Sequence, residues 1–233
     1  MMKVRYATIS KIGRRNKNED AFRVVDMPDA HRFMGLICDG LGGHAKGEVA
    51  SETVANATVE YWKAHIQVPD CCDKVTAACK HAYRALDMRA YELGHCVMGT
   101  TLVMVSIENN MMTVGHVGDS RCYLMRPGEG LVYQTRDHLK NDNGWEVLDR
   151  CFFSYHPEKV EAEVKQFEVK PGDRILLCSD GLYKSMSHNT LKMRLMDDKP
   201  LEDIINDYDL LCEKHGDDNY TAIIMEMQKS LIL

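Results

Sequence analysis

The chain has 233 residues, 45% hydrophobic and 27% charged, a size that fits one well-packed domain better than two. Its formal net charge of -6 argues against nucleic-acid binding, which normally shows as clustered Lys and Arg, and no apolar run approaches membrane-spanning length. Nine cysteines without a CxxC pair do not suggest a disulfide framework, so we expect a cytoplasmic protein with reduced cysteines, no signal peptide, and no nucleic-acid or membrane partner.

The first predicted elements are three strands around an acidic pair. Residues 3–10 alternate enough to predict a strand, and residues 21–25 and 32–38 predict two more, joined by a turn at a Pro-Asp pair. Antiparallel pairing of the second and third strands would place Glu19 and Asp20, at the beginning of one, beside Asp39, at the end of the other.

A glycine-rich turn and two long helices follow Asp39. A carboxylate held by the hydrogen bonds of a strand next to flexible glycines can face a cleft that the backbone approaches closely. The spacing of apolar residues then predicts a helix over 45–66 and a second over about 72–93, with Gly94 as the stop.

The middle of the chain is predicted to form hairpins. Residues 99–107 and 111–117 are strands joined by an Asn-Asn pair, which tolerates the conformations of a tight turn, and this hairpin leads to Asp119. Residues 120–125 and 131–135 predict a second hairpin. Consecutive hairpins indicate an antiparallel sheet.

The last third holds the remaining elements. Residues 136–157 show no clear period and are interpreted as a surface flap. Strands are predicted at 162–169, 174–179 and 220–227, and helices at 190–196 and 201–215. Asp180 ends one of these strands, and Asp217 and Asp218 precede the last one.

Four acidic turns at strand ends, around Asp39, Asp119, Asp180 and Asp218, are the most informative feature. Carboxylate, carbonyl and water oxygens are the ligands that Mg²⁺ and Mn²⁺ prefer. A turn-forming Asp beside Gly or Asn is common, however, and at Asp119 a hairpin-turn role is as consistent with the sequence as a metal role. The four together favour a site for a hard cation.

These turns, in this order, resemble the metal-dependent Ser/Thr protein phosphatases of the 2C type (PPM family), and the DGLGG variant is similar to prokaryotic stand-alone catalytic domains. The matching stretches are 15–20, 39–51, 99–101, 117–121, 136–138, 177–182 and 218–219. The resemblance implies an α+β fold, a four-layer αββα sandwich with two central antiparallel β-sheets flanked by helices. It also implies a single catalytic domain over 1–233 with a short flap at about 138–160.

The resemblance further implies a metal centre with two Mn²⁺ or Mg²⁺ ions. Asp39 would bridge the two ions, with the carbonyl of Gly40 on one and Asp180 and Asp218 on the other. Asp119 together with Asp180 would bind a third ion. Paired cations lower the pKa of a bridging water and stabilise both entering and leaving oxygens of an in-line displacement.

Three further residues receive catalytic roles from the resemblance. Glu19 and Asp20 would hold metal-bound waters or the nucleophile, and Arg15 would bind the phosphate, to which its forked guanidinium is suited. The implied reaction is attack of metal-bound hydroxide on phosphoserine or phosphothreonine of a protein substrate, by a monomeric enzyme and without a covalent intermediate.

Two other functions compete with this one. The stretch 40–45 (GLGGHA) fits a dinucleotide-binding fingerprint and would indicate an oxidoreductase, but Asp39 abuts the loop and the following hairpins do not continue a βαβ pattern. A phosphatase-like regulatory binding module is the second alternative, which the retention of every expected carboxylate opposes. His44 is a weak candidate for a catalytic acid, and His116 is predicted to be a packed core histidine.

Overall fold

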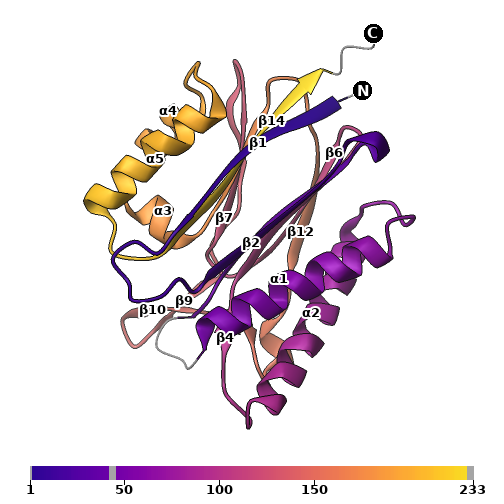
Figure 1. Ribbon diagram of the computed structural model, residues 1–233, viewed down its shortest axis with the longest axis vertical. Coiled ribbons are helices and arrows are strands. Elements are labelled where there is room, and N and C mark those ends of the chain that lie inside the picture. The colour runs from indigo at the N-terminus through magenta and orange to yellow at the C-terminus, as the bar shows by residue number, and fades with distance from the viewer. Residues whose placement is uncertain (1, 42–45, 230–233) are drawn as a thin grey trace.

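The computed structural model describes residues 2–41 and 46–229. Two five-stranded antiparallel sheets pack face to face, and helices cover both outer faces, so the predicted α+β, four-layer sandwich is confirmed (Figure 1). The first sheet has the order β1 (Met2–Lys11), β14 (Tyr220–Lys229), β13 (Arg174–Cys178), β7 (Arg121–Arg126) and β8 (Gly130–Gln134). The second has the order β12 (Glu163–Glu168), β6 (Met111–Val117), β5 (Leu102–Glu108), β3 (Arg32–Asp39) and β2 (Asp20–Met27).

The helices divide between the two faces. Helices α1 (Gly47–Ala64) and α2 (Cys72–Glu92) pack on the second sheet, and α3 (Asp180–Lys184), α4 (His188–Leu195) and α5 (Leu201–His215) pack on the first. The start predicted for the first helix, Ala45, lies outside the described residues. Among the helices in the described ranges, none is both long and apolar enough to cross a membrane.

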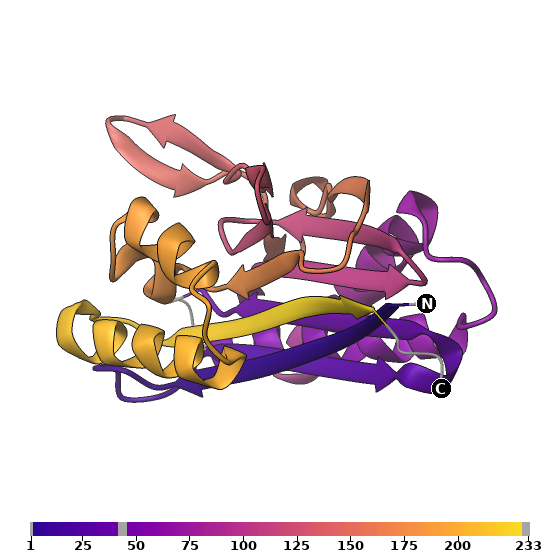
Figure 2. The same ribbon diagram turned by 90° about the horizontal axis from the view of Figure 1, so that it is seen from above.

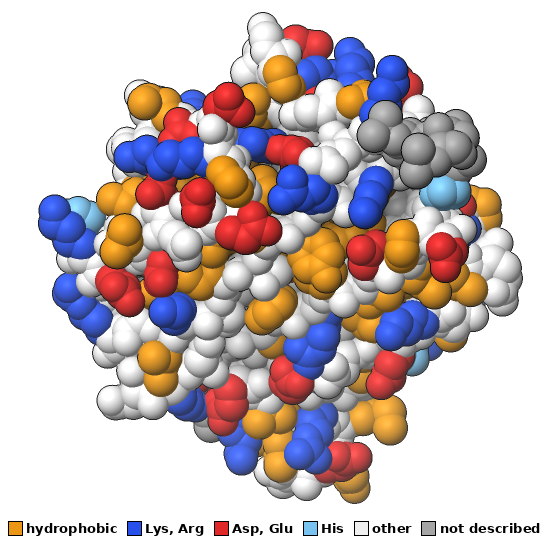
Figure 3. Space-filling model, turned by 45° about the horizontal axis from the view of Figure 1, so that its top comes forward, with side chains coloured by type: hydrophobic (Ala, Val, Ile, Leu, Met, Phe, Trp, Pro, Cys, Tyr) orange, Lys and Arg blue, Asp and Glu red, His pale blue; other side chains and the backbone are white. Residues whose placement is uncertain are grey.

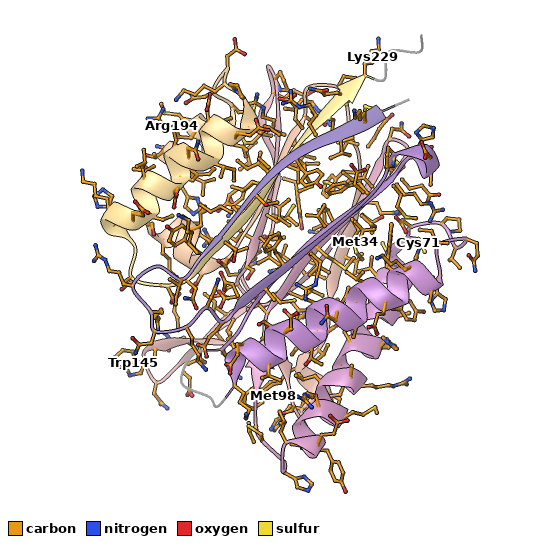
Figure 4. The ribbon with its side chains drawn as sticks, in the orientation of Figure 1. Met34, Cys71, Met98, Trp145, Arg194 and Lys229 are labelled. Carbon is orange, nitrogen blue, oxygen red and sulfur yellow. The ribbon has the colours of Figure 1, made fainter. Side chains whose placement is uncertain are left out.

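Strand β3 shows why the central strands read as unbroken apolar runs. Phe33 and Ile37 face the other sheet, whereas Met34 and Leu36 face the layer formed by α1 and α2, where Figure 4 labels Met34. All four side chains are at most 1% exposed. A strand buried on both faces has no polar side, so its sequence does not alternate.

The register brings the acidic turns to one end of the sandwich. Asp20 pairs directly with Asp39 in the β2–β3 hairpin, as the sequence predicted. In the other sheet, Cys178 pairs with Ala222, which sets the end of β13 beside the beginning of β14. The turn predicted between β2 and β3 is a short 3₁₀ helix, Pro28–Ala30.

The flap is a hairpin of β9 (Leu139–Asp142) and β10 (Trp145–Leu148) that stands out from the sandwich (Figure 2). Trp145 near its tip is 77% exposed (Figure 4). The hairpin is shorter than the predicted 138–160 because the chain then returns to the body. There β11 (Phe152–Phe153) pairs with β4 (Gly99–Thr100), ahead of a 3₁₀ turn at Pro157–Lys159.

Candidate active site

A polar cleft of about 310 Å³ lies where the ends of both sheets meet, beside the root of the flap. It is lined by Arg15, Glu19, Asp39, Gly40, Leu41, Thr101, Asp119, Leu148, Asp180, Asp218 and Asn219. Every residue with a predicted site role is in this lining except Asp20. Asp20 is directly paired with Asp39, and its Oδ2 accepts a hydrogen bond from Ser179 of the other sheet (2.8 Å). The structure therefore brings four distant segments of the chain together.

The backbone of Asp39 is fixed on both sides by two threonines. Thr101 donates its N–H to the carbonyl of Asp39 (2.9 Å), and its Oγ1 accepts the N–H of Asp39 (3.0 Å). Thr100 Oγ1 donates to the same carbonyl (2.8 Å), and Thr101 Oγ1 is 2.7 Å from Ser120 Oγ. These buried hydroxyls leave the Asp39 backbone little freedom. Apart from the Gly-Thr-Thr stretch, nothing in the sequence indicated this role.

Gly40 must be glycine because three segments meet at its Cα. A Cβ there would lie 2.5 Å from the carbonyl oxygen of Gly47, at the start of α1, and 2.7 Å from that of Glu19. The N–H of Gly40 donates to the latter (3.1 Å). The beginning of α1 and the acidic pair are thus packed against the residue after Asp39. His44, the weak candidate for an acid, lies outside the described residues.

Asp180 and Asp218 are placed by a second close approach of backbones. A Cβ on Gly181 would lie 2.0 Å from the carbonyl oxygen of Asn219, so the first turn of α3 rests on the segment before β14. Ser179 donates its N–H to Thr221 O (3.0 Å) and accepts the N–H of Thr221 at its Oγ (2.9 Å). This pairing continues the β13–β14 ladder up to the cleft.

Asn219 organises the loop that carries Arg15 and Glu19. Its Oδ1 accepts the N–H of Glu19 (2.9 Å), and its Nδ2 donates to the carbonyls of Ile12 (2.7 Å) and Lys17 (2.9 Å). An amide side chain is needed here, since a carboxylate cannot donate to carbonyls. Sequence reasoning noted only the Asp-Asn pair and missed this positioning role.

The carboxylates destabilise one another's charged forms. Burial, followed by the charges of Asp20, Asp180 and Asp119, raises the pKa of Asp39 well above its ordinary value. Burial is also the main cause that raises the pKa values of Asp20 and Asp119 to about 6, with a contribution from the charge of Asp180 to both. The cluster is therefore short of positive charge, which a bound cation supplies.

Cations of the chain hold several of these carboxylates. Arg15 Nη2 lies 2.7 Å from Asp218 Oδ2. Lys17 Nζ lies 3.0 Å from Glu19 Oε1, and Lys184 Nζ lies 2.5 Å from Asp180 Oδ2. In the described ranges, no three His, Cys, Asp or Glu side chains are grouped closely enough to form a preformed metal site.

The donor set nevertheless fits a hard divalent cation. It consists of carboxylate oxygens and the Gly40 carbonyl, and the buried Oδ1 of Asp20 has no hydrogen-bond partner. An oxygen set of this kind suits Mg²⁺ or Mn²⁺ rather than a thiolate-seeking metal.

The root of the flap is tied to the loop that bears Asp119. His138 donates its N–H to Gly118 O (3.0 Å) and accepts the N–H of Gly118 at Nδ1 (3.1 Å). Asp137 accepts two hydrogen bonds from Arg121 (2.9 and 2.8 Å). His116 packs against His138 with 4.3 Å between the ring centroids and is 1% exposed, which confirms the predicted core histidine.

Comparisons with known proteins give a consistent result. The family model of protein phosphatase 2C matches residues 9–216. The serine/threonine protein phosphatase PstP of Mycobacterium tuberculosis is 31% identical over 96% of this chain and 45% of its own length. The protein phosphatase PhpP of Streptococcus pneumoniae is 27% identical over 95% of this chain and 96% of its own. The chain thus spans about half the length of PstP.

Comparison with solved structures points to the same family. A crystal structure of Mycobacterium tuberculosis PstP matches with 28% identity and a TM-score of 0.81, covering 97% of this chain and 99% of that one. The PstP catalytic domain in complex with two manganese ions matches with 28% identity and a TM-score of 0.80, covering 98% of this chain and 100% of that one.

Proposed function

The chain belongs to the protein phosphatase 2C family, and from this membership we propose that it hydrolyses phosphoserine and phosphothreonine in proteins with bound Mn²⁺ or Mg²⁺ ions. The observation that carries the proposal is the convergence of Asp39, Asp119, Asp180 and Asp218 with Arg15 in one cleft. Their mutual repulsion supports a site that works with cations bound.

In this proposal Asp39, the carbonyl of Gly40, Asp180 and Asp218 hold two divalent ions. When bound, such ions supply positive charge that acidifies water and neutralises the phosphate during in-line displacement. The relative whose structure contains two manganese ions supports this number. The threonine hydrogen bonds to the Asp39 backbone keep the carboxylate in position.

Arg15 binds the phosphate of the substrate. Its side chain is 50% exposed and is held in the cleft by Asp218 and by the carbonyl of Asp217 (3.3 Å). The guanidinium has five donors in a planar fork, so it can turn toward a phosphate at the cleft mouth. An arriving phosphate therefore competes with Asp218 for Arg15.

Glu19 and Asp20 orient the attacking water. Their oxygens accept hydrogen bonds from water and direct its lone pair to phosphorus, opposite the leaving serine or threonine oxygen. Among the described residues that line the cleft, none is a cysteine, serine or histidine, and the hydroxyl of Thr101 is hydrogen-bonded to Asp39 and Ser120. The proposal assigns the carboxylates to the ions and the water, so that water attacks directly and no covalent enzyme intermediate forms.

The dinucleotide alternative is disfavoured by the same features. The sheets are antiparallel throughout, whereas a dinucleotide-binding unit needs a βαβ crossover. An acidic cleft also repels a pyrophosphate that brings no cation with it.

We further propose that the protein is a cytoplasmic monomer. Five cysteines lie buried in the apolar cores as thiols, which is typical of a reducing compartment: Cys38, Cys79, Cys122, Cys178 and Cys212. The face drawn in Figure 3 intermingles basic and acidic side chains, as on a solvated surface. Analytical ultracentrifugation of the purified chain at micromolar concentration tests this, and we expect the mass of a single chain.

Release of phosphate from p-nitrophenyl phosphate and from a phosphothreonine peptide tests the function. We expect turnover with Mn²⁺, loss of turnover with EDTA, and loss of turnover in Asp39→Ala with Mn²⁺. Asp29→Ala, an exposed aspartate in the 3₁₀ turn at the other end of β3, is the matched control and should behave as wild type. Equal turnover with Mn²⁺ and EDTA, or none in any condition, would reject the proposal.

A further inference from the structure

The end of helix α2 carries a surface patch of large apolar and aromatic side chains. Met88 and Tyr91 are each 66% exposed, and Val97 and Tyr155 are 44% and 41% exposed. His95 completes the patch, since its ring centroid lies 4.9 Å from that of Tyr91 and 6.2 Å from that of Tyr155. We call these five residues the aromatic patch. A contiguous group of exposed apolar side chains is typical of a contact surface.

Hydrogen bonds fix the loops that carry the aromatic patch. Ser154 donates its N–H to the carbonyl of Met98 (3.0 Å) and accepts the N–H of Met98 at Oγ (3.1 Å). Tyr155 donates its N–H to Asp87 Oδ1 (2.8 Å). His95 (φ 61°) and Tyr155 (φ 67°) are both held in the left-handed region, which residues other than glycine seldom adopt. A partner therefore meets rings that are already in place, so that binding orders few groups.

Asp87 gives the patch a negative charge. Together with Met88, Tyr91 and Glu92, it lines an open hollow on α2. Glu92 is paired with Arg89 (2.9 Å), whereas no basic side chain within residues 2–41 and 46–229 forms an ion pair with Asp87. A basic side chain with an apolar stem, such as that of arginine, fits this hollow. Its stem can cover Met88 and the Tyr91 ring while its charge lies beside the carboxylate.

The aromatic patch is continuous with the wall of the cleft. Leu41 lines the cleft and donates its N–H to the carbonyl of Gly99 (3.0 Å). A Cβ on Gly99 would lie 2.7 Å from both Leu41 Cδ1 and Phe153 Cδ2, so these two side chains meet over Gly99. Tyr155 follows Phe153 by two residues, and α2 ends at the same end of the sandwich as β4 and the flap (Figure 1). The path from Leu41 to Tyr91 is on the order of 20 Å, about six residues of extended chain.

We propose that the aromatic patch binds the segment of the phosphoprotein substrate that flanks the phosphorylated residue, and that it selects a basic side chain about six residues from the phosphate. This inference rests on the proposed function and specifies its substrate class. The phosphate occupies the cleft while the basic residue lies over Met88 and Tyr91, with Asp87 as its counter-charge. p-Nitrophenyl phosphate fills only the cleft and does not reach the patch.

Hydrolysis of phosphothreonine peptides with Mn²⁺ tests this inference. The peptides have a serine-glycine background and carry one arginine at each position within about nine residues of the phosphothreonine, on either side. We expect the lowest KM with arginine about six residues away on one side, about tenfold below that of the peptide without arginine, at similar kcat. A KM that does not depend on arginine, or that is lowest with arginine next to the phosphothreonine, would overturn the inference.

Two variants locate the bound arginine. Tyr91→Ala removes an exposed ring, and Asp87→Asn removes the charge but keeps an oxygen that can accept the Tyr155 N–H. In each variant, the tenfold advantage of the arginine peptide should fall to about threefold or less, while kcat/KM for p-nitrophenyl phosphate stays at the wild-type value. Leu210→Ala, at a 65% exposed position of α5, and Asp29→Asn are the matched controls and should keep the advantage. A full advantage in both patch variants would also overturn the inference.

The outcomes separate this inference from the proposed function. Wild type that releases no phosphate from p-nitrophenyl phosphate with Mn²⁺ would overturn the function on which the inference rests. Wild type that hydrolyses p-nitrophenyl phosphate but has one KM for all peptides would overturn the inference alone. A dimer in analytical ultracentrifugation that Tyr91→Ala dissociates would assign the patch to a second copy of the chain, which would likewise overturn it.

Discussion

Buried aspartates at the two ends of the sandwich differ in whether a buried cation is paired with them. At the end opposite the cleft, Asp173 is fully buried and accepts two hydrogen bonds of 2.8 Å from Arg126, whose side chain is 12% exposed. Asp70 is similarly paired with buried Lys74, at 2.8 Å. In both cases one acid is matched by one buried cation.

At the cleft, the basic side chains are exposed to solvent, whereas Asp39 is buried. The side chains of Arg15, Lys17 and Lys184 are each 50% to 61% exposed, and Asp39 has no cation bonded to it in the described residues. Matched buried pairs serve stability, since removal of one partner leaves an uncompensated charge. Unmatched buried acids serve function, because they lower stability until a cation binds.

The largest expected effect is the loss of a matched pair. Asp173→Asn removes the charge that accepts two hydrogen bonds from the largely buried Arg126, which keeps only the exposed Glu129 at 3.6 Å. It should lower the free energy of unfolding by about 3 kcal/mol. Urea unfolding measures it, with Asp29→Asn as a control that has no buried partner. Because Asp173 is remote from the cleft, kcat of the folded variant should stay at the wild-type value. A change below about 0.5 kcal/mol would contradict the comparison.

Loss of an unmatched acid should lower activity and, without a metal, raise stability, which is the opposite of the effect expected for Asp173. Asp39→Asn should lower kcat/KM by at least about 100-fold, beyond the loss typical of outer-shell partners of a metal. In EDTA it should raise Tm, because it removes the charge that Asp20 and Asp180 repel. Phosphate release and thermal unfolding give the two readouts. A variant less stable than wild type in EDTA would show that Asp39 is a structural residue.

The pH dependence sharpens the comparison further. The pKa values of Asp20 and Asp119 rise to about 6 in the folded chain from an ordinary 3.8, so the folded state binds more protons between about pH 4 and 6. These groups therefore favour folding at low pH, and stability falls as pH rises through 6. In EDTA, Tm should drop by a few degrees between pH 5 and 7. Saturating Mn²⁺ should reverse that drop. A Tm in EDTA that does not change between pH 5 and 7 would contradict the raised pKa values of these acids.

The smallest effect concerns the threonine hydrogen bonds. Thr101→Val keeps the shape of the side chain but removes the acceptor for the Asp39 N–H and the partner of Ser120. We expect kcat/KM to fall about tenfold and stability to fall by about 1 to 3 kcal/mol, since a buried donor is left unsatisfied. Thr53→Val, whose hydroxyl bonds only within α1, is the control for stability without activity loss. Wild-type kcat/KM in Thr101→Val would show that Asp39 needs no such support.

The sequence predicted the fold where apolar periodicity and turn chemistry agree. Strand β3 and the β5–β6 hairpin follow directly from their residues, and the acids at their ends were visible as turns. The flap hairpin was not predicted as strands, because Lys140 and Trp145 are exposed and no buried face gives it a period. The positioning roles of Asn219 and Thr101 also stayed hidden, since their partners lie 200 and 62 residues away in the chain.

The central claim is that the unmatched acids of the cleft gather around shared divalent cations. Thermal unfolding of wild type and Asp39→Asn at pH 7.5, each in EDTA and in Mn²⁺, tests it most directly. The account predicts that Mn²⁺ raises the Tm of wild type by several degrees and leaves the Tm of Asp39→Asn nearly unchanged. A wild-type Tm that Mn²⁺ does not move, or the same increase in both proteins, would contradict it.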